Sequence, residues 1–240
     1  MSSIYDEIKK RAFDVLDKDL LNRNITVKAR ALSTEEAIGN PESDDFPLMK
    51  GKERLMHAEL EGAAGQAFTD QYGDFEGTLK DILESDLNNN YRKAIFIASL
   101  NAALRHMGLI QGTIHCRDKE PGECAAQLVE HIKSEYGSPR ITQIGFQPKF
   151  VEKVSSSFKL RVIDLDKDNI GTKKYDTLIE GPDKTDDAIE WADLLLVTGT
   201  TIANGTIDKF IDKKPVLFYG TTIAGAAHLM GWDRFCAKGK

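Results

Sequence analysis

After residue 138, short apolar runs alternate with short helical patterns, and this alternation limits the chain to few folds. The predicted strands are Thr142–Gly145, Lys159–Leu165, Leu194–Thr198 and Val216–Tyr219, and the predicted helices between them are Phe150–Ser157 and Ile207–Asp212. Strands separated by helices in this way indicate a parallel sheet with helices on its faces. We therefore expect an α/β fold with a mostly parallel sheet in this half of the chain.

Ligands of such sheets bind outside the carboxyl ends of the strands. The segments that directly follow the four predicted strands are therefore the first candidates for a binding site. They are Gly145–Pro148, Asp164–Asp168, Gly199–Thr206 and Gly220–Thr222.

Before residue 138, helical patterns dominate, so we expect two domains, residues 1–138 and 139–240. A first amphipathic helix carries its apolar stripe on Ile4, Ile8, Ala12 and Val15. A helix that is apolar on most sides, and hence buried, is predicted from Tyr91 to Met107.

Three further segments complete this first half. Pro121 begins another helix, which ends at Tyr136 before Gly137. Apolar and polar residues alternate from Ile25 to Ala31, which predicts a half-buried strand. The turn-forming residues of Glu35–Phe46 predict a loop.

Composition excludes several classes of function. The 240 residues carry a net charge of −6, which gives no overall attraction to nucleic acid or to an anionic membrane. No apolar run is long enough to span a bilayer. Three cysteines do not make a disulfide framework, so we expect a cytoplasmic protein. From the charge and the short apolar runs, we expect neither nucleic-acid nor membrane partners. A homodimer would be usual for such a protein.

The clearest candidate for ligand binding is the segment after the strand Leu194–Thr198. Glycine at 199 and 205 lets backbone N–H groups approach a ligand, and the helix expected to follow directs its positive end at the loop. An anionic or oxygen-rich ligand would be stabilised there, although a well-capped turn explains the same residues. The candidate ligand-binding residues are Gly199, Thr200, Thr201, Asn204, Gly205 and Thr206.

Known phosphate motifs do not fit this half of the chain. The spacing of Gly199 and Gly205, with no lysine after them, excludes a P-loop. The turn after the first strand has a single glycine, Gly145, where a dinucleotide fingerprint needs three. Asp164 follows the second strand, where an acid often binds sugar hydroxyls, and is a candidate for ligand binding.

A second candidate group lies at residues 115–124. His115, Cys116 and Cys124 place one imidazole and two thiols close together in the sequence, and transition metals favour such ligands. We expect the N-terminus of the helix that Pro121 begins to favour the thiolate of Cys124. Buried cysteines without a metal explain the same pattern, and on a strand His115 and Cys116 would face opposite ways.

Two candidates come from the first half of the chain. His57, Glu59 and Glu61 would share one face of a strand, which makes His57 and Glu59 candidate acid–base residues. A strand with one solvated face explains them equally well. Asn101 lies on a buried face of the apolar helix, so its amide needs partners, either backbone groups or a ligand at the domain boundary.

Three motifs resemble the heavy-metal-chelation family, long catalogued as a domain of unknown function. They are TGTTIANGT after the strand DLLLV, the helix SLNAALRHMG and the turn IGFQPKF. The resemblance implies an α+β domain like the N-terminal domain of enolase, followed by a Rossmann-like domain, with the site between them. It assigns that site to Gly199, Thr200, Asn204, Gly205 and Thr206, and also to Asn101 and Gln147.

Three functions remain open at this stage. The first is binding of a small oxygen-rich or metal-chelating molecule between the domains, in heavy-metal chelation. The second is a Rossmann-like transferase or hydrolase that acts on a pterin-, flavin- or siderophore-like molecule, with S-adenosylmethionine as one candidate cofactor. The third is a non-catalytic metal carrier that uses His115, Cys116 and Cys124, with a transition metal ion as cofactor.

Overall fold

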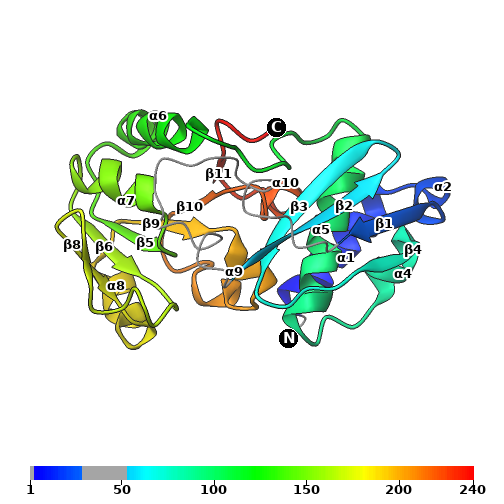
Figure 1. Cartoon of the computed structure of the whole chain (residues 1–240), viewed down its shortest axis with the longest axis horizontal. Helices are drawn as coiled ribbons and strands as arrows, with labels where there is room; N and C mark the ends of the chain where they lie inside the picture. The colour runs from blue at the N-terminus through cyan, green and yellow to red at the C-terminus, as the bar shows by residue number, and fades with distance from the viewer. Residues whose placement is uncertain (1–2, 29–52) are drawn as a thin grey trace.

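The computed structural model describes residues 3–28 and 53–240 and contains two sheets with helices between and around them (Figure 1). The antiparallel sheet has the strand order β3-β2-β1-β4. Its strands are β1 (Asn24–Lys28), β2 (Arg54–Leu60), β3 (Ala63–Thr69) and β4 (Phe75–Thr78). The helices of this unit are α1 (Ile4–Val15), α2 (Lys18–Leu21), α4 (Leu79–Glu84) and α5 (Asn90–His106).

Helix α5 is buried along most of its length, as its apolar sequence predicts. One side packs against β2 and β3, and another packs against α10 (Ala224–Met230). The approach to the sheet is close at Gly65, where a Cβ atom would lie 2.3 Å from the carbonyl oxygen of Ala98. Glycine at this position therefore sets the distance between the sheet and the helix.

The second sheet has the order β11-β10-β9-β5-β6-β8-β7, and only β7 and β8 pair antiparallel in it. Its strands are β5 (Ile141–Ile144), β6 (Leu160–Ile163), β7 (Lys173–Lys174), β8 (Thr177–Glu180), β9 (Leu194–Thr198), β10 (Val216–Tyr219) and β11 (Arg234–Phe235). From β5 the chain runs outward to β6, and from β9 it runs the other way to β10. The sheet therefore has its topological switch point between β5 and β9, where α/β sheets bind ligands.

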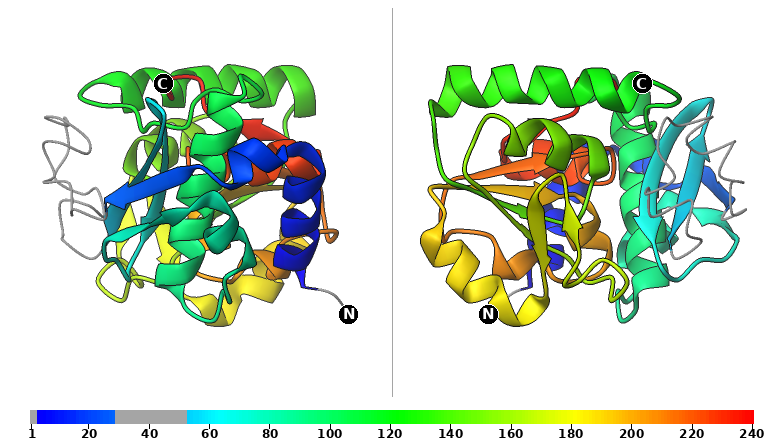
Figure 2. Two further views of the ribbon diagram at one scale, coloured as in Figure 1. Left: turned by 90° about the vertical axis from the view of Figure 1, so that its right-hand side faces the viewer. Right: turned by 60° about the vertical axis from the view of Figure 1, so that its left-hand side comes forward.

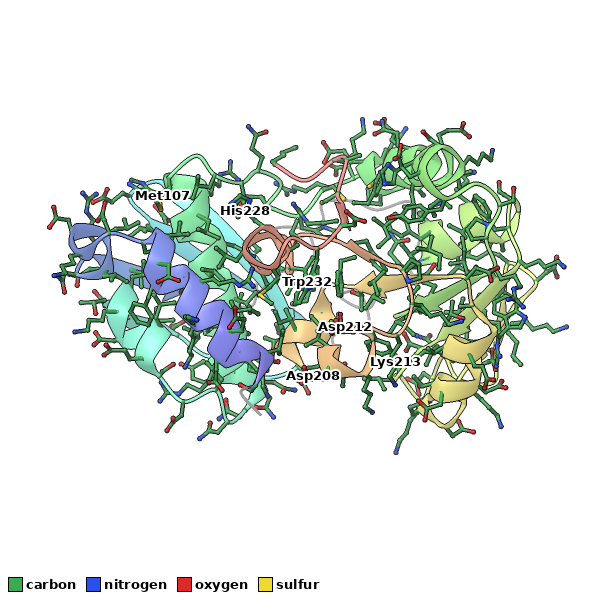
Figure 3. The ribbon with its side chains drawn as sticks, turned by 180° about the vertical axis from the view of Figure 1, so that it is seen from behind. Met107, Asp208, Asp212, Lys213, His228 and Trp232 are labelled. Carbon is green, nitrogen blue, oxygen red and sulfur yellow. The ribbon has the colours of Figure 1, made fainter. Side chains whose placement is uncertain are left out.

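The helices of this second unit cover its faces (Figure 2). They are α6 (Glu120–Tyr136), α7 (Pro148–Ser155), α8 (Thr185–Trp191), the single turn α9 (Thr200–Ala203) and α10, with short 3₁₀ turns at Pro182–Lys184 and Ile207–Lys209. Seen from behind, α1 lies beside α10, which carries His228 and is followed by Trp232 (Figure 3). Among the described helices, none combines the length and apolar character of a membrane span.

Helix α6 belongs with the parallel sheet. Its buried residues, among them Leu128 and Ile132, pack with Phe150 and Leu194 of that unit. Helix α6 thus packs with the parallel sheet, although it precedes the predicted boundary at residue 138, which stays a prediction. A second apolar cluster, which includes Leu100 of α5 and Val197 of β9, extends across both units.

The predicted α/β class is confirmed, and the four predicted strands are present as β5, β6, β9 and β10. Two local predictions are wrong. The segment Ile207–Asp212 contains a 3₁₀ turn in place of a helix, and Leu16 is buried where we expected Val15, which is 38% exposed. Residues 29–31 of one predicted strand and the predicted loop Glu35–Phe46 lie outside the described residues.

Candidate functional site

A cavity of about 650 Å³ lies at the switch point of the parallel sheet and is lined by both units. Residues from all four segments that follow the predicted strands line it, among them Gly145, Asp164, Gly199 and Gly220. Phe68 and Thr69 of β3 line it from the antiparallel sheet. Its volume is within the range of sites for small organic ligands and cofactors.

The cavity brings together most of the candidate residues, although they are far apart in the sequence. Those that line it are Gln147, Asp164, Gly199, Thr200, Thr201, Asn204, Thr206, His115, Cys116 and Cys124. His57, Glu59, Asn101 and Gly205 are not among its lining residues. One pocket thus joins the predicted oxygen-rich loop to the predicted thiol and imidazole group.

The loop after β9 differs locally from our expectation, because the helical turn α9 begins directly after Gly199. Its polar groups hold that turn in place. The hydroxyl of Thr201 donates to the carbonyl of Thr198 at 2.7 Å, and Asn204 Oδ1 accepts from the backbone N–H and the hydroxyl of Thr206 at 3.1 and 2.7 Å. Gly205 has a φ of +78°, which explains glycine between Asn204 and Thr206.

Gln147 and Asp164 stabilise the turn after β5 as well as lining the cavity. Gln147 Oε1 accepts from the backbone N–H of Phe150 and caps α7. The Asp164 carboxylate accepts from the N–H groups of Phe146 at 2.6 Å and Asp166 at 2.7 Å. Burial nevertheless raises the pKa of Asp164. Both oxygens of Asp164 therefore have backbone donors before any sugar hydroxyl is bound.

Three cysteines line the cavity, and one of them was not a candidate from the sequence. Cys236 follows β11 and lines the cavity with Cys116 and Cys124. The segment that carries it runs beside residue 114, because Lys240 and Ile114 exchange two backbone hydrogen bonds, at 2.8 and 3.0 Å. A sequence separation of more than a hundred residues hid this proximity.

Burial is the main influence on the pKa values of Cys116 and Cys124. It raises the pKa of Cys124 to about 11, although backbone N–H groups of Ala237 and Lys238 donate to its sulfur and act in the opposite direction. The pKa of Cys116 is raised as well, again mainly by burial. The expected preference for the thiolate at Cys124 is therefore not met, because desolvation outweighs the backbone donors.

His115 is held as a neutral imidazole. Its Nδ1 lies 2.6 Å from the carbonyl oxygen of Cys116, and its ring makes an edge contact with Phe68 at 5.2 Å between centroids. Burial lowers the pKa of His115 to about 4. When Nδ1 donates to this carbonyl, Nε2 keeps its lone pair. A histidine in this arrangement can bind a metal ion or accept a hydrogen bond from a ligand through Nε2.

The thiols and the imidazole do not form a ready-made metal site. Within residues 3–28 and 53–240, no three His, Cys, Asp or Glu side chains are grouped closely enough to hold one metal ion. His115, Cys116 and Cys124 therefore share a cavity without sharing a coordination centre in this conformation.

Glu53, ahead of β2, is an acid–base candidate that our sequence analysis missed. It lines the cavity, and burial together with the carboxylates of Asp164, Asp70 and Asp166 raises its pKa to about 7. A carboxyl that titrates near neutral pH can hold or release a proton at a bound ligand. Nothing in its local sequence marks it, since the neighbouring acids come from two other segments.

His57 and Glu59 do lie on one face of β2, but that face does not reach the cavity. His57 pairs across the strands with Gln66, whose Nε2 lies 3.2 Å from His57 Nδ1. Gln66 Oε1 accepts from the backbone N–H of His115 at 2.7 Å. His57 is thus connected to the cavity only through Gln66. Glu59 is exposed, and Glu61 lies in the β2–β3 turn at a φ of +48°.

Asn101 has backbone partners on both sides of the boundary between the units. Its Nδ2 donates to the carbonyls of Gln66, Thr221 and Thr222, and its Oδ1 accepts from the N–H of Gly225 at 2.7 Å. The side chain is fully buried. Of the two expectations for this amide, backbone partners rather than a ligand account for its hydrogen bonds.

Residues 127–223 match the model of the DUF364 family, which is described as "Putative heavy-metal chelation". The matched residues include β5, β6, β9, β10 and the turns after them, which form the parallel-sheet side of the cavity. A search of curated proteins finds no match.

Two solved structures of DUF364 proteins have a similar fold, and both are described as of unknown function. The protein from Pyrococcus horikoshii is 17% identical, with a TM-score of 0.55 over 92% of this chain and 80% of that one. The protein from Desulfitobacterium hafniense is 10% identical, with a TM-score of 0.56 over 94% of this chain and 82% of that one. At these identities the likeness shows the fold alone.

Proposed function

We propose that this protein binds a small oxygen-rich or metal-chelating molecule in the cavity between its two sheets and acts in heavy-metal chelation. One observation carries the proposal: the Gly-Thr-Asn loop and the His-Cys group, chosen separately from the sequence, line the same cavity. Hydroxyl, amide and backbone groups on one wall suit the oxygen atoms of a ligand, and sulfur and imidazole on the other suit a soft metal that it carries.

The charges of the cavity support a metal-loaded ligand over a bare anion. Five acidic residues line it, Glu53, Asp70, Asp164, Asp166 and Asp168, against two lysines, Lys167 and Lys209. A polyanion would be repelled by the carboxylates, whereas a chelate brings its own cation to them. Because the described residues provide no closed set of metal ligands, the ligand itself would supply part of the coordination.

A fluorescent reporter at the rim tests this proposal. Leu165 lines the cavity and is 58% exposed, so Leu165→Trp places an indole beside a bound ligand. Leu178 is 48% exposed and does not line the cavity, which makes Leu178→Trp the matched control. We expect zinc-loaded citrate or zinc-loaded 2,3-dihydroxybenzoate to change the emission of the first variant only. No change in either variant at millimolar ligand would contradict the proposal.

A transferase or hydrolase acting on a pterin-, flavin- or siderophore-like molecule is the second candidate. It is supported by Asp164 at the end of β6, the strand next to β5, and by the proton that Glu53 can carry near neutral pH. Calorimetric titration with S-adenosylmethionine tests its cofactor: binding heat would favour this candidate, and its absence at millimolar concentration would argue against it. Cytoplasmic location and a homodimer stay predictions.

A further inference from the structure

The pentapeptide Gly-Thr-Thr-Ile-Ala occurs twice in the chain, at residues 199–203 and 220–224. Each copy directly follows a parallel strand, the first after β9 and the second after β10. These strands are neighbours, and Thr198 is paired in register with Tyr219. The two copies therefore begin at equivalent positions on adjacent strands, about 4.8 Å apart.

The two turns are in contact and face the same cavity. A Cβ atom on Gly199 would lie 2.8 Å from the backbone nitrogen of Ile223, so the first turn packs directly on the second. The first three residues of each copy line the cavity, Gly199, Thr200 and Thr201 from one and Gly220, Thr221 and Thr222 from the other. We call this pair of turns the twin Gly-Thr-Thr site.

The hydroxyl groups of the site divide into two pairs. Thr201 and Thr222 have structural partners, since Thr201 donates to the Thr198 carbonyl and Thr222 accepts from the N–H of Phe68. Thr200 and Thr221 occupy the other equivalent position of the repeated sequence, although the backbone of the two copies differs, with a φ of −60° at Gly199 and +94° at Gly220. Thr200 Oγ1 accepts from the hydroxyl of Thr198 at 3.3 Å and keeps its own proton for another partner.

Thr221 is the decisive residue. Its side chain is 1% exposed, it lines the cavity, and its Oγ1 has no hydrogen-bond partner. A buried hydroxyl without a partner costs free energy that a methyl group would not. Valine, which has the same shape, would remove this cost, so the hydroxyl at this position points to a partner that arrives from the cavity.

We propose that Thr200 and Thr221 donate their hydroxyl protons to two neighbouring oxygen atoms of one ligand. The inference rests on the proposed function and names its ligand class: molecules with oxygens on adjacent atoms, such as catechols, hydroxamates and α-hydroxycarboxylates. Because the two turns are in contact and follow neighbouring strands, one donor from each can reach one oxygen of such a pair. The same oxygen pairs chelate metal ions.

Ligand pairs that differ by one oxygen test the site most sharply. Catechol and phenol form one pair, and acetohydroxamate and acetamide form the other. Binding is measured by NMR of threonine methyl groups, with Thr69 as a second reporter in the cavity and Thr142 as a reporter outside it. We expect catechol and acetohydroxamate to shift the signals of both Thr200 and Thr221, and to bind more tightly than phenol and acetamide.

Substitutions then separate binding from folding. Thr221→Val should bind catechol about tenfold more weakly than the wild type, bind phenol equally well, and keep or raise the melting temperature. Thr200→Val should weaken the binding of catechol in the same way. The control is Ser99→Ala, which removes a second buried hydroxyl that has no partner but does not line the cavity. Ser99→Ala should leave the affinities for catechol and for phenol unchanged.

Three results would overturn the twin site. Shifts at Thr69 without shifts at Thr200 and Thr221 would leave ligand binding in the cavity standing and refute this site. Equal affinity of Thr221→Val and the wild type for catechol would refute it too. If none of the four probes shifts a cavity methyl, the site is refuted as well, while the proposed function is judged separately by the rim reporter.

Discussion

Replacement of Asn101 by alanine should destabilise the protein strongly, because one amide connects both units. Asn101 lies on α5, and its hydrogen bonds reach β3 at Gln66 and the segment after β10 at Thr221, Thr222 and Gly225. The side chain is fully buried, so water cannot replace it in the folded protein. The variant therefore leaves buried backbone groups of two units without this partner.

The magnitude follows from the partners. The two protons of the amide are shared among three carbonyls, and each hydrogen bond contributes about 1 kcal/mol net to the free energy of unfolding. The N–H of Gly225 also loses its acceptor, and an unpaired buried donor costs about 1–3 kcal/mol. Together with the small void that alanine leaves, we expect a loss of about 4 kcal/mol.

Urea unfolding followed by circular dichroism measures this loss. Asn101→Asp is an informative second variant, because it keeps the acceptor for Gly225 but cannot donate to the three carbonyls when ionised. It should also be strongly destabilised at pH 7. The control is Ser99→Ala on the same helix, which removes a buried hydroxyl that has no partner and should be neutral or stabilising. A loss below about 1 kcal/mol for Asn101→Ala would refute the reasoning.

Three further changes have expected outcomes. Burial lowers the pKa of His115 to about 4 from its ordinary 6.5, so between these pH values the unfolded chain binds a proton that the folded protein does not. The free energy of unfolding should therefore fall as the pH is lowered from 6.5 to 4, and urea unfolding of His115→Gln should lose this part of the pH dependence. The pKa of Glu53 is raised from 4.5 to about 7, so the wild type should lose stability as the pH rises through this range, because the unfolded chain releases the proton first. Glu53→Gln should therefore melt at a higher temperature than the wild type at pH 8 and at the same temperature at pH 4.5. Gly65→Ala should cost about 3 kcal/mol or more in urea unfolding, since its Cβ would lie 2.3 Å from Ala98 O and 2.4 Å from Ala102 N, and a wild-type midpoint would show that α5 can move away.

The parallel sheet and much of the cavity wall were predictable from local sequence. Short apolar runs predict β5, β6, β9 and β10 because each of these strands is buried and bounded by turn residues. The rule that ligands bind at the carboxyl ends of such strands then selects the turns after them. Since parallel strands end at one edge of the sheet, turns far apart in sequence come to line one cavity.

Other features depend on long-range packing, which local patterns do not contain. The sequence places His57 on one face of a strand, but the packing of β2 and β3 on α5 decides what that face contacts. Cys236 lines the cavity with Cys116 and Cys124 because β11 pairs with β10 and Lys240 pairs with Ile114. Likewise, the thiolate expected at Cys124 follows from its place in α6, whereas its burial comes from the assembled core.

The repeated Gly-Thr-Thr-Ile-Ala is different, because its signal was in the sequence and was missed. Residues 220–222 were selected as a segment after a strand, but their identity with residues 199–201 was not compared. Five residues are too short to indicate a repeat architecture. On neighbouring parallel strands, however, even a short repeat places two copies of one turn sequence side by side, although a helix begins at Thr200 in the first and only at Ala224 in the second.

The central claim is that the cavity holds a small oxygen-rich or metal-chelating molecule. Its most direct test is to purify the protein without a metal-affinity tag, determine its metal content by elemental analysis, and identify by mass spectrometry any organic molecule released on denaturation. We predict an organic ligand with neighbouring oxygen atoms, alone or with a near-stoichiometric metal. A stoichiometric metal without any organic molecule, lost on replacing Cys116 and Cys124 by serine, would contradict the claim and favour a metal carrier.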